Sequence, residues 1–231
     1  MENTLLIDAD DTLWENNIHY EKVTLDFVTL MKSKKIMEHG IEQFLRKKEM
    51  DNVKHYGYGA DSLYRTMNDV YKEACEKEFQ KTEKEMFDWI KKARSRIRNY
   101  EIEFLTGVTE VLPKLQLKNF LVLVTKGNRD EQKDKIKRSG VSKFFHHTRV
   151  VDEKHLDTYL DIIEEFKLDP KTTWMIGNSP RSDINPAKAA GLGTVFIPYH
   201  TTWEHEVEEI DTNGRETIVV DNFYGLLEYF G

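Results

Sequence analysis

Two acidic side chains directly follow a short apolar run near the start of the sequence. Leu5, Leu6 and Ile7 lead into Asp8, and Asp10 stands two positions later. Such a run is typical of a buried strand, and the alternation of an extended chain places both carboxylates on one side, about 6–7 Å apart. Paired carboxylates suit a hard, oxygen-seeking cation such as Mg²⁺. A solvated acidic turn is the alternative, and the rest of the chain has to decide between the two.

Two further apolar stretches also end in polar residues. The stretch 120–124 leads into Thr125 and Lys126, and the stretch 172–177 leads into Asn178. Continuous apolar runs of this length are typical of buried strands in a parallel sheet. In such a sheet the carboxyl ends of the strands meet at one edge, where ligands bind.

Lys154 and Asp183 stand near the ends of these predicted strands and can join the same edge. The combined set supplies carboxylates, a hydroxyl, an ammonium group and backbone N–H groups at helix starts. Hydrogen-bond donors and an ammonium group can bind a phosphate, and a carboxylate can bind a metal ion or act as the nucleophile. The sequence therefore predicts a metal-assisted phosphoryl-transfer site.

The stretch 15–105 has a different character from the rest of the chain. It contains no proline, whereas all five prolines lie after residue 112, and its acidic and basic residues nearly balance. Apolar residues recur there at helical spacing. We expect an inserted bundle of about four helices. The first covers 17–38, with Gly40 as a stop, and the second covers 41–54. The third follows a cap at Asp61 or Ser62, and the fourth follows a capping box of Thr82 and Glu85.

From residue 106 onward, predicted strands alternate with predicted helices, which indicates a mainly parallel, doubly wound sheet. The fold prediction is a Rossmann-like α/β core formed by 1–14 and 106–231, with a helical domain over 15–105. Beyond the runs above, we expect strands over 144–151, 193–198 and 217–220 and helices over 129–139, 155–167, 181–190 and 222–230.

Composition limits the possible partners. The 231 residues are 39% hydrophobic and 32% charged with a net charge of −7, which is ordinary for a folded protein and argues against a nucleic-acid surface. The sequence has no basic leader and no 18-residue apolar stretch, so we expect a cytoplasmic protein without a membrane partner. The single cysteine, Cys75, is expected in a core.

The order of these residues resembles the haloacid dehalogenase-like (HAD) superfamily, in its phosphatase branch. The run 8–12, DADDT, matches the first motif of that family, DxDx[TV], and Thr125 matches the second. Lys154 matches the third by position, although His155 replaces the proline often found there. The run 177–183, GNSPRSD, resembles the fourth motif, GDxxxxD. A helical insert between the first and second motifs fits the helical cap of the family.

The resemblance implies a mechanism. Asp8 would attack phosphorus and form an aspartyl-phosphate, and Asp10 would protonate the leaving oxygen and then take a proton from water. The Thr125 hydroxyl and the Lys126 N–H would bind the phosphoryl group, and Lys154 would neutralise charge.

The resemblance also implies the metal ligands. Mg²⁺ would be held by Asp8, the backbone carbonyl of Asp10, and the fourth motif through Asn178 and Asp183. Asn178 departs from the usual Asp, and its neutral oxygen is a weaker ligand, so that Asp183 becomes the main acid of that motif. Dehalogenases of the superfamily lack the second acid of the first motif, so Asp10 favours phosphate chemistry.

The predicted function is a Mg²⁺-dependent phosphatase for a small phosphorylated metabolite, such as a sugar phosphate, a nucleotide or phosphoglycolate, acting as a monomer or homodimer. The alternatives are a phosphosugar mutase and a catalytically weak binding or regulatory protein, the latter suggested by Asn178.

Several other polar and aromatic residues carry weaker expectations. Thr12 is expected to orient the first loop, in one interpretation by bonding Asp10. The run 200–209 invites a metal site at His200 and His205, but a surface loop leading into a helix is the better interpretation. Asn128 is expected to bind substrate or cap the helix after it. Candidate substrate contacts are Trp14, Tyr20, His55, Tyr56, Tyr58 and Arg65.

Overall fold

The computed structural model describes residues 2–203 and 206–231, and the chain divides into two compact units. One unit comprises Met1–Asn17 and Ile102–Gly231, and the other comprises Ile18–Glu101. The first is an α/β unit and the second is helical throughout its regular structure. The helical unit is therefore inserted in the sequence between the first and second strands of the α/β unit.

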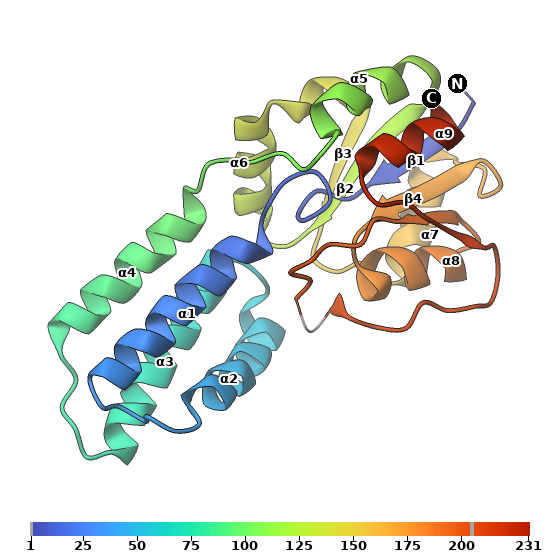
Figure 1. Cartoon of the computed structure of the whole chain (residues 1–231). Helices are drawn as coiled ribbons and strands as arrows, with labels where there is room; N and C mark the ends of the chain where they lie inside the picture. The colour runs from blue at the N-terminus through green and yellow to red at the C-terminus, as the bar shows by residue number, and fades with distance from the viewer. Residues whose placement is uncertain (1, 204–205) are drawn as a thin grey trace. The chain divides into compact units, whose positions relative to one another are not determined.

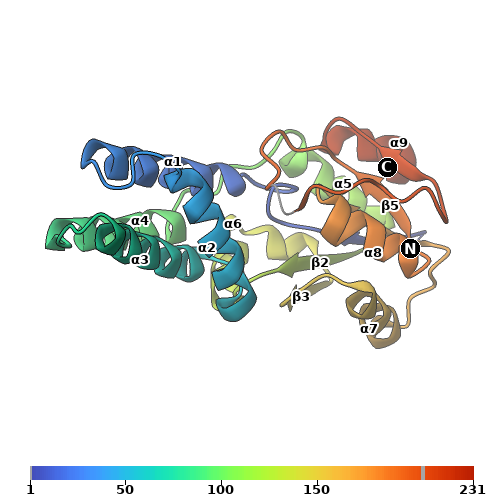
Figure 2. The same cartoon turned by 90° about the horizontal axis from the view of Figure 1, so that it is seen from below.

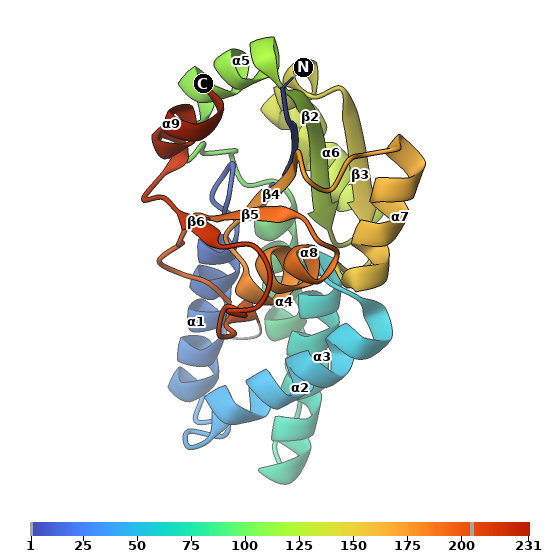
Figure 3. The ribbon, with the colours of Figure 1, turned by 90° about the vertical axis from the view of Figure 1, so that its right-hand side faces the viewer.

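The α/β unit is built on a six-stranded sheet in which each neighbouring pair of strands is parallel. The strand order is β3-β2-β1-β4-β5-β6, so β1 lies between β2 and β4. Figure 1 labels most of these strands, and Figure 3 shows β2 and β3 side by side. The strands are β1 Thr4–Ile7, β2 Phe120–Lys126, β3 His147–Val151, β4 Thr173–Gly177, β5 Gly193–Phe196 and β6 Thr217–Val219.

Side-chain alternation explains why helices cover both faces of this sheet. Leu5 and Ile7 pack into one apolar cluster, with residues of the helices over 108–118, 129–139 and 227–230. Leu6 packs into another cluster, with residues of the helices over 156–166 and 185–189. A strand that is apolar on both faces needs a helical layer on each. The predicted doubly wound α/β core is confirmed.

The helices of this unit precede, connect and follow the strands of the sheet. Figure 1 shows α5 and α9 on one side of the sheet and α7 and α8 on the other. Their bounds are α5 Val108–Lys118, α6 Arg129–Ser139, α7 Leu156–Phe166, α8 Asn185–Ala189 and α9 Leu227–Phe230, with 3-10 helices η1 Val141–Phe144 and η4 Phe223–Leu226 and a π-helical turn η2 Pro180–Ile184.

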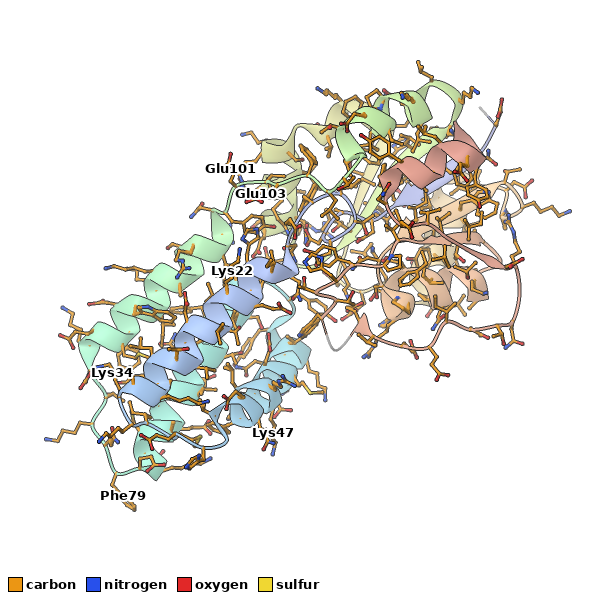
Figure 4. The ribbon with its side chains drawn as sticks, viewed as in Figure 1. Lys22, Lys34, Lys47, Phe79, Glu101 and Glu103 are labelled. Atoms are coloured by element: carbon orange, nitrogen blue, oxygen red, sulfur yellow. The ribbon has the colours of Figure 1, made fainter. Side chains whose placement is uncertain are left out.

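The helical unit is built by α1 Asn17–Ser33, α2 Ile41–Tyr56, α3 Ala60–Lys77 and α4 Lys84–Arg98. These helices share an apolar cluster of their own and lie near one another in Figure 2. Cys75 is buried in this cluster, as predicted. At the turn between α3 and α4, Phe79 is 98% exposed and points outward (Figure 4). Among the described residues, no helix is long and apolar enough to cross a membrane.

The predicted end of the first helix was wrong. Helix α1 ends at Ser33, because Lys35 adopts a left-handed conformation with φ of 56° and the N–H of Ile36 donates back to the carbonyl of Met31. A left-handed residue at this position of a helix end is usually glycine, and here Lys35 takes it. Gly40 instead precedes α2, with φ of 81°.

The two predicted helix caps in this unit were also wrong. Helix α3 already begins at Ala60, which places Asp61 inside its first turn, where it pairs with Arg94. Helix α4 begins at Lys84, and Glu83 takes the capping position without a side-chain cap. The backbone N–H of Glu83 donates to the Tyr71 hydroxyl at 2.7 Å, which satisfies a group that a capping box would otherwise satisfy.

Candidate active site

The polar residues predicted from the sequence gather at the carboxyl edge of the sheet. The N–H of Asp8 donates to the carbonyl of Ile176 at 3.0 Å, so Asp8 continues the pairing of β1 with β4. Thr125 lies near the end of β2, and Asn178 follows β4 directly. Because β1 lies between these two strands, where the strand order reverses, the three ends adjoin at the place where doubly wound sheets bind ligands.

The centre of this site is an ammonium group between two carboxylates. Lys154, only 3% exposed, donates to Asp8 Oδ1 and to Asp183 Oδ1, the latter at 2.7 Å. Burial raises the pKa of Asp8 to about 7, with a further contribution from the Asp183 carboxylate, while the Lys154 ammonium opposes both. Burial alone would lower the pKa of Lys154, but the two carboxylates outweigh it and raise that pKa. Lys154 therefore stays charged beside Asp8.

Thr12 orients Asp8 rather than Asp10, which corrects one interpretation of the sequence. Its buried hydroxyl lies 3.2 Å from Asp8 Oδ2 and 3.1 Å from Asn178 Oδ1, and it donates toward both. Because one hydroxyl reaches both acceptors, the side-chain oxygens of Asp8 and Asn178 converge on one small region.

Thr125 is buried to 1% exposure, and its hydroxyl has no hydrogen-bond partner in the described structure. A buried hydroxyl without a partner costs free energy, and in native proteins it calls for an explanation such as a ligand or catalytic role. A phosphoryl oxygen is a partner of suitable chemistry. The position of Thr125 at the end of β2, beside β1, places this hydroxyl at the edge where Asp8 lies.

The fourth-motif loop is held by Asp183. Its Oδ2 accepts from the N–H of Ser179 at 3.0 Å, while its Oδ1 accepts from Lys154. Gly177 makes this packing possible, because a Cβ there would stand 2.2 Å from Asp183 Oδ2. Asp183 thus links the loop that carries Asn178 to Lys154.

The donor set fits a divalent cation by chemistry. The described residues contain no cluster of three or more His, Cys, Asp or Glu arranged to hold a metal. The oxygens of Asp8 and Asn178 nevertheless converge, and within the described residues the carboxylates of Asp8 and Asp183 share the one ammonium group of Lys154. Oxygen donors with excess negative charge suit Mg²⁺, which keeps several waters and needs few protein carboxylates.

Asp10 is engaged by residues that the sequence prediction missed. Trp14 Nε1 donates to Asp10 Oδ1 at 2.8 Å, Gln132 Nε2 donates to Oδ2 at 2.8 Å, and Lys135 contacts both oxygens. Trp14 is fully buried in the α/β unit, so it positions Asp10 and does not take the predicted role of a substrate contact. A signal was present in α6, whose inward positions Gln132 and Lys135 are polar where a core helix is normally apolar.

A second missed group surrounds Lys126. Its ammonium contacts Glu206 and lies 2.8 Å from Ser182 Oγ, and Glu206 also accepts from the hydroxyls of Ser179 and Ser182. Burial alone would raise the pKa of Glu206, but Lys126 and the hydroxyl donors outweigh it and lower that pKa. The predicted surface loop leading into a helix is therefore wrong at Glu206, which is buried against the fourth-motif loop.

Asp11 connects the first motif to α1. It adopts a left-handed conformation with φ of 59°, and its carboxylate accepts from the N–H groups of Asn16 and Asn17 at the start of that helix. Burial raises the pKa of Asp11 to about 7, against the effect of these hydrogen bonds.

The remaining sequence predictions have mixed outcomes. Asn128 caps α6 by accepting from the N–H groups of Asp130 and Glu131, both at 3.1 Å. His200 lies in the described structure, whereas His205 lies outside the described residues. The other candidate substrate contacts lie in the helical unit, where Tyr20 packs against the apolar cluster: Tyr20, His55, Tyr56, Tyr58 and Arg65.

Comparison with known proteins identifies the family. The model of the family described as haloacid dehalogenase-like hydrolase matches residues 25–197. The chain belongs to the haloacid dehalogenase-like hydrolases. A crystal structure of such a hydrolase from Xanthomonas campestris is 30% identical with a TM-score of 0.80, and the match covers 97% of this chain and 88% of that one.

Other relatives of this haloacid dehalogenase-like hydrolase are more distant. A magnesium-bound HAD hydrolase from Bacillus subtilis has a TM-score of 0.64 at 18% identity, with 99% of this chain and 98% of that chain covered. Haloacid dehalogenases are also among the structural neighbours, and they share the fold. A glyceraldehyde 3-phosphate phosphatase from Pyrococcus furiosus is 28% identical over 108 residues, and the match covers 44% of this chain but only 45% of that relative.

Proposed function

We propose that this hydrolase is a Mg²⁺-dependent phosphatase that acts on a small phosphomonoester through an aspartyl-phosphate on Asp8. The observation that carries the proposal is the fixed carboxylate of Asp8. It is buried at the tip of β1, with Lys154 on one oxygen and Thr12 beside the other. A carboxylate held in this way has the orientation that a nucleophile needs.

The first step would transfer the phosphoryl group to the protein. An oxygen of Asp8 attacks phosphorus, the ester P–O bond breaks, and Asp10 gives a proton to the leaving oxygen. Lys154 offsets the negative charge that gathers around Asp8, and the free Thr125 hydroxyl donates to a phosphoryl oxygen. The N–H of Lys126 would bind the same group.

The second step would release phosphate. Water attacks phosphorus, its proton passes to Asp10, and the bond between Asp8 and phosphorus breaks. Mg²⁺, held by Asp8, the backbone carbonyl of Asp10, Asn178 and Asp183, would supply positive charge that offsets the repulsion between nucleophile and phosphate. The glyceraldehyde 3-phosphate phosphatase relative supports a small phosphate ester as substrate.

A second candidate function is a weak enzyme that mainly binds a phosphorylated ligand. Asn178 favours it, because a neutral amide oxygen replaces the carboxylate usual in the fourth motif. Carbon–halogen cleavage is disfavoured by Asp10, an acid for which that reaction has no use.

The test is phosphate release from a panel of small phosphate esters, with and without Mg²⁺, by the wild-type protein and Asp8→Asn. The phosphatase proposal expects metal-dependent release that disappears in Asp8→Asn. Binding of an ester by folded protein, without release of phosphate, would favour the binding protein. Isomerisation of a sugar phosphate without release would instead indicate a mutase.

A further inference from the structure

The Asp10 carboxylate accepts four hydrogen bonds within the part of the chain that the structure describes, and each of them comes from a nitrogen donor. Oδ1 accepts from Trp14 Nε1 and from Lys135 Nζ, at 2.8 and 2.7 Å. Oδ2 accepts from Gln132 Nε2 at 2.8 Å and also from Lys135. A carboxylate offers about four lone-pair positions, so these four contacts use its whole accepting capacity.

Lys135 is committed to this contact. It is only 2% exposed, and its three N–H bonds go to the two oxygens of Asp10 and to Asn16 Oδ1 at 3.1 Å. A buried ammonium is costly unless it is fully paired, and a helix face turned toward a core normally carries apolar residues. Its presence on α6 therefore needs a reason beyond packing.

Gln132 supplies the same kind of evidence. Its Nε2 donates to Asp10 and to the carbonyl of Lys126 at 2.9 Å, while its buried Oε1 has no partner in the described structure. The orientation that directs Nε2 toward Asp10 therefore leaves the Oε1 acceptor of the same amide without a hydrogen bond in the described structure. Residues 132 and 135 are three positions apart, so they lie on one face of α6. Gly127, with φ of 127°, leaves room for this side chain.

We propose that Lys135 and Gln132 are positioning residues that set the orientation of Asp10 for proton transfer to the leaving group. This inference rests on the proposed phosphatase function. Neither residue touches the reacting atoms. The two contacts from the Lys135 ammonium group join opposite charges, so they are the stronger ones and fix the carboxyl group. One of the contacts from the uncharged donors of Trp14 and Gln132 opens when Asp10 carries a proton.

Substrates whose leaving groups differ in their need for a proton can distinguish a positioning role of Lys135 from a purely structural one. A p-nitrophenolate leaves without a proton, whereas an alkoxide from a simple alkyl phosphate needs one. General acid catalysis contributes about 10²–10⁴-fold, and misplacing the acid removes a large part of it. We expect Lys135→Met to lower kcat/KM for an alkyl phosphate by about 10–100-fold and for p-nitrophenyl phosphate by less than about threefold.

Two further variants sharpen the result. Lys135→Arg should restore much of the alkyl phosphate activity, because a guanidinium also donates to both carboxylate oxygens. Gln132→Leu should shift the ratio of the two activities in the same direction by a smaller factor. The matched control is Lys133→Met, an exposed lysine on the same helix, which should leave the ratio unchanged.

Both esters are measured on the same preparation, so partial unfolding lowers both rates equally and cancels in their ratio. Equal losses on the two esters, or no loss in Lys135→Met, would overturn the inference and leave the phosphatase proposal standing. Failure of the wild-type protein to release phosphate from any ester of the panel would overturn the proposed function and this inference with it.

Discussion

The ion pair between Lys126 and Glu206 gives the most quantitative prediction. Glu206→Gln replaces a carboxylate by an amide of the same shape, in a place where the two side chains are only 17% and 12% exposed. The amide oxygen can still accept from Lys126, and the serine hydroxyls can turn to accept from the new NH₂ group. The variant therefore keeps these hydrogen bonds but loses the negative charge that strengthens them, which lowers the free energy of unfolding by about 2 kcal/mol.

For a protein of this size, about 2 kcal/mol corresponds to a fall in melting temperature of about 4–8 °C. The lowered pKa of Glu206 sets the pH dependence. A lowered folded-state pKa contributes stability that is present above the unfolded value of 4.5 and is lost as pH falls below it. The difference between wild type and variant should therefore be full at pH 7 and should shrink only as pH falls below 4.5 and through the lowered pKa of the folded state. Glu208→Gln, at an exposed position on the same loop, is the matched control.

A double-mutant cycle with Lys126→Met completes the test by measuring whether the two losses are coupled. Each single variant leaves one buried charge without its partner, whereas the double variant leaves none. We expect each variant, including the double one, to lose about 2 kcal/mol, as measured by denaturant unfolding. Losses that add in the double variant would refute the argument that these two residues form one buried pair.

Three other changes give distinct outcomes. Thr125→Val should leave the melting temperature unchanged or higher, because it removes an unpaired buried hydroxyl, yet lower phosphate release about tenfold or more; retained activity would exclude Thr125 from phosphoryl binding. Asn178→Asp should raise the rate at limiting Mg²⁺, measured by metal titration, and an unchanged titration curve would contradict a metal role for this position. Burial raises the pKa of Glu49 to about 7, so its charged form destabilises the fold increasingly as pH rises from 4.5 to about 7. Glu49→Gln should raise the melting temperature at pH 8 through a gain in the free energy of unfolding of up to about 3 kcal/mol, less for the part of the side chain that water reaches, and should raise it much less at pH 5.

The strands and the order of the motifs were predictable because both depend on local patterns. Each buried strand appears as a continuous apolar run, and each ends in the polar residues that meet at the sheet edge. Helix ends were less predictable. Helix α1 ends through a left-handed lysine, Lys35, and α4 begins where Tyr71 satisfies the N–H of Glu83, and neither arrangement has a local sequence signal.

The residues around the predicted site were missed for a related reason. Lys135 and Glu206 are charged residues in charged stretches, and such residues are usually solvated. Only the packing of α6 against the first loop, and of the loop after β5 against the fourth-motif turn, makes them buried partners of Asp10 and Lys126. Contacts between residues more than 70 positions apart cannot be read from spacing along one sequence.

The central claim, a covalent phosphoryl group on Asp8, is tested most directly by trapping it. The Asp10→Asn variant still accepts a phosphoryl group from p-nitrophenyl phosphate, whose leaving group needs no proton, but it cannot activate water for the second step. We expect acid quenching and peptide mass spectrometry to find one phosphate on Asp8 in this variant, and none when Asp8 is also replaced by Asn. Phosphate release by the wild-type protein, with no phosphate on Asp8 in the quenched variant and with activity retained in Asp8→Asn, would contradict the account.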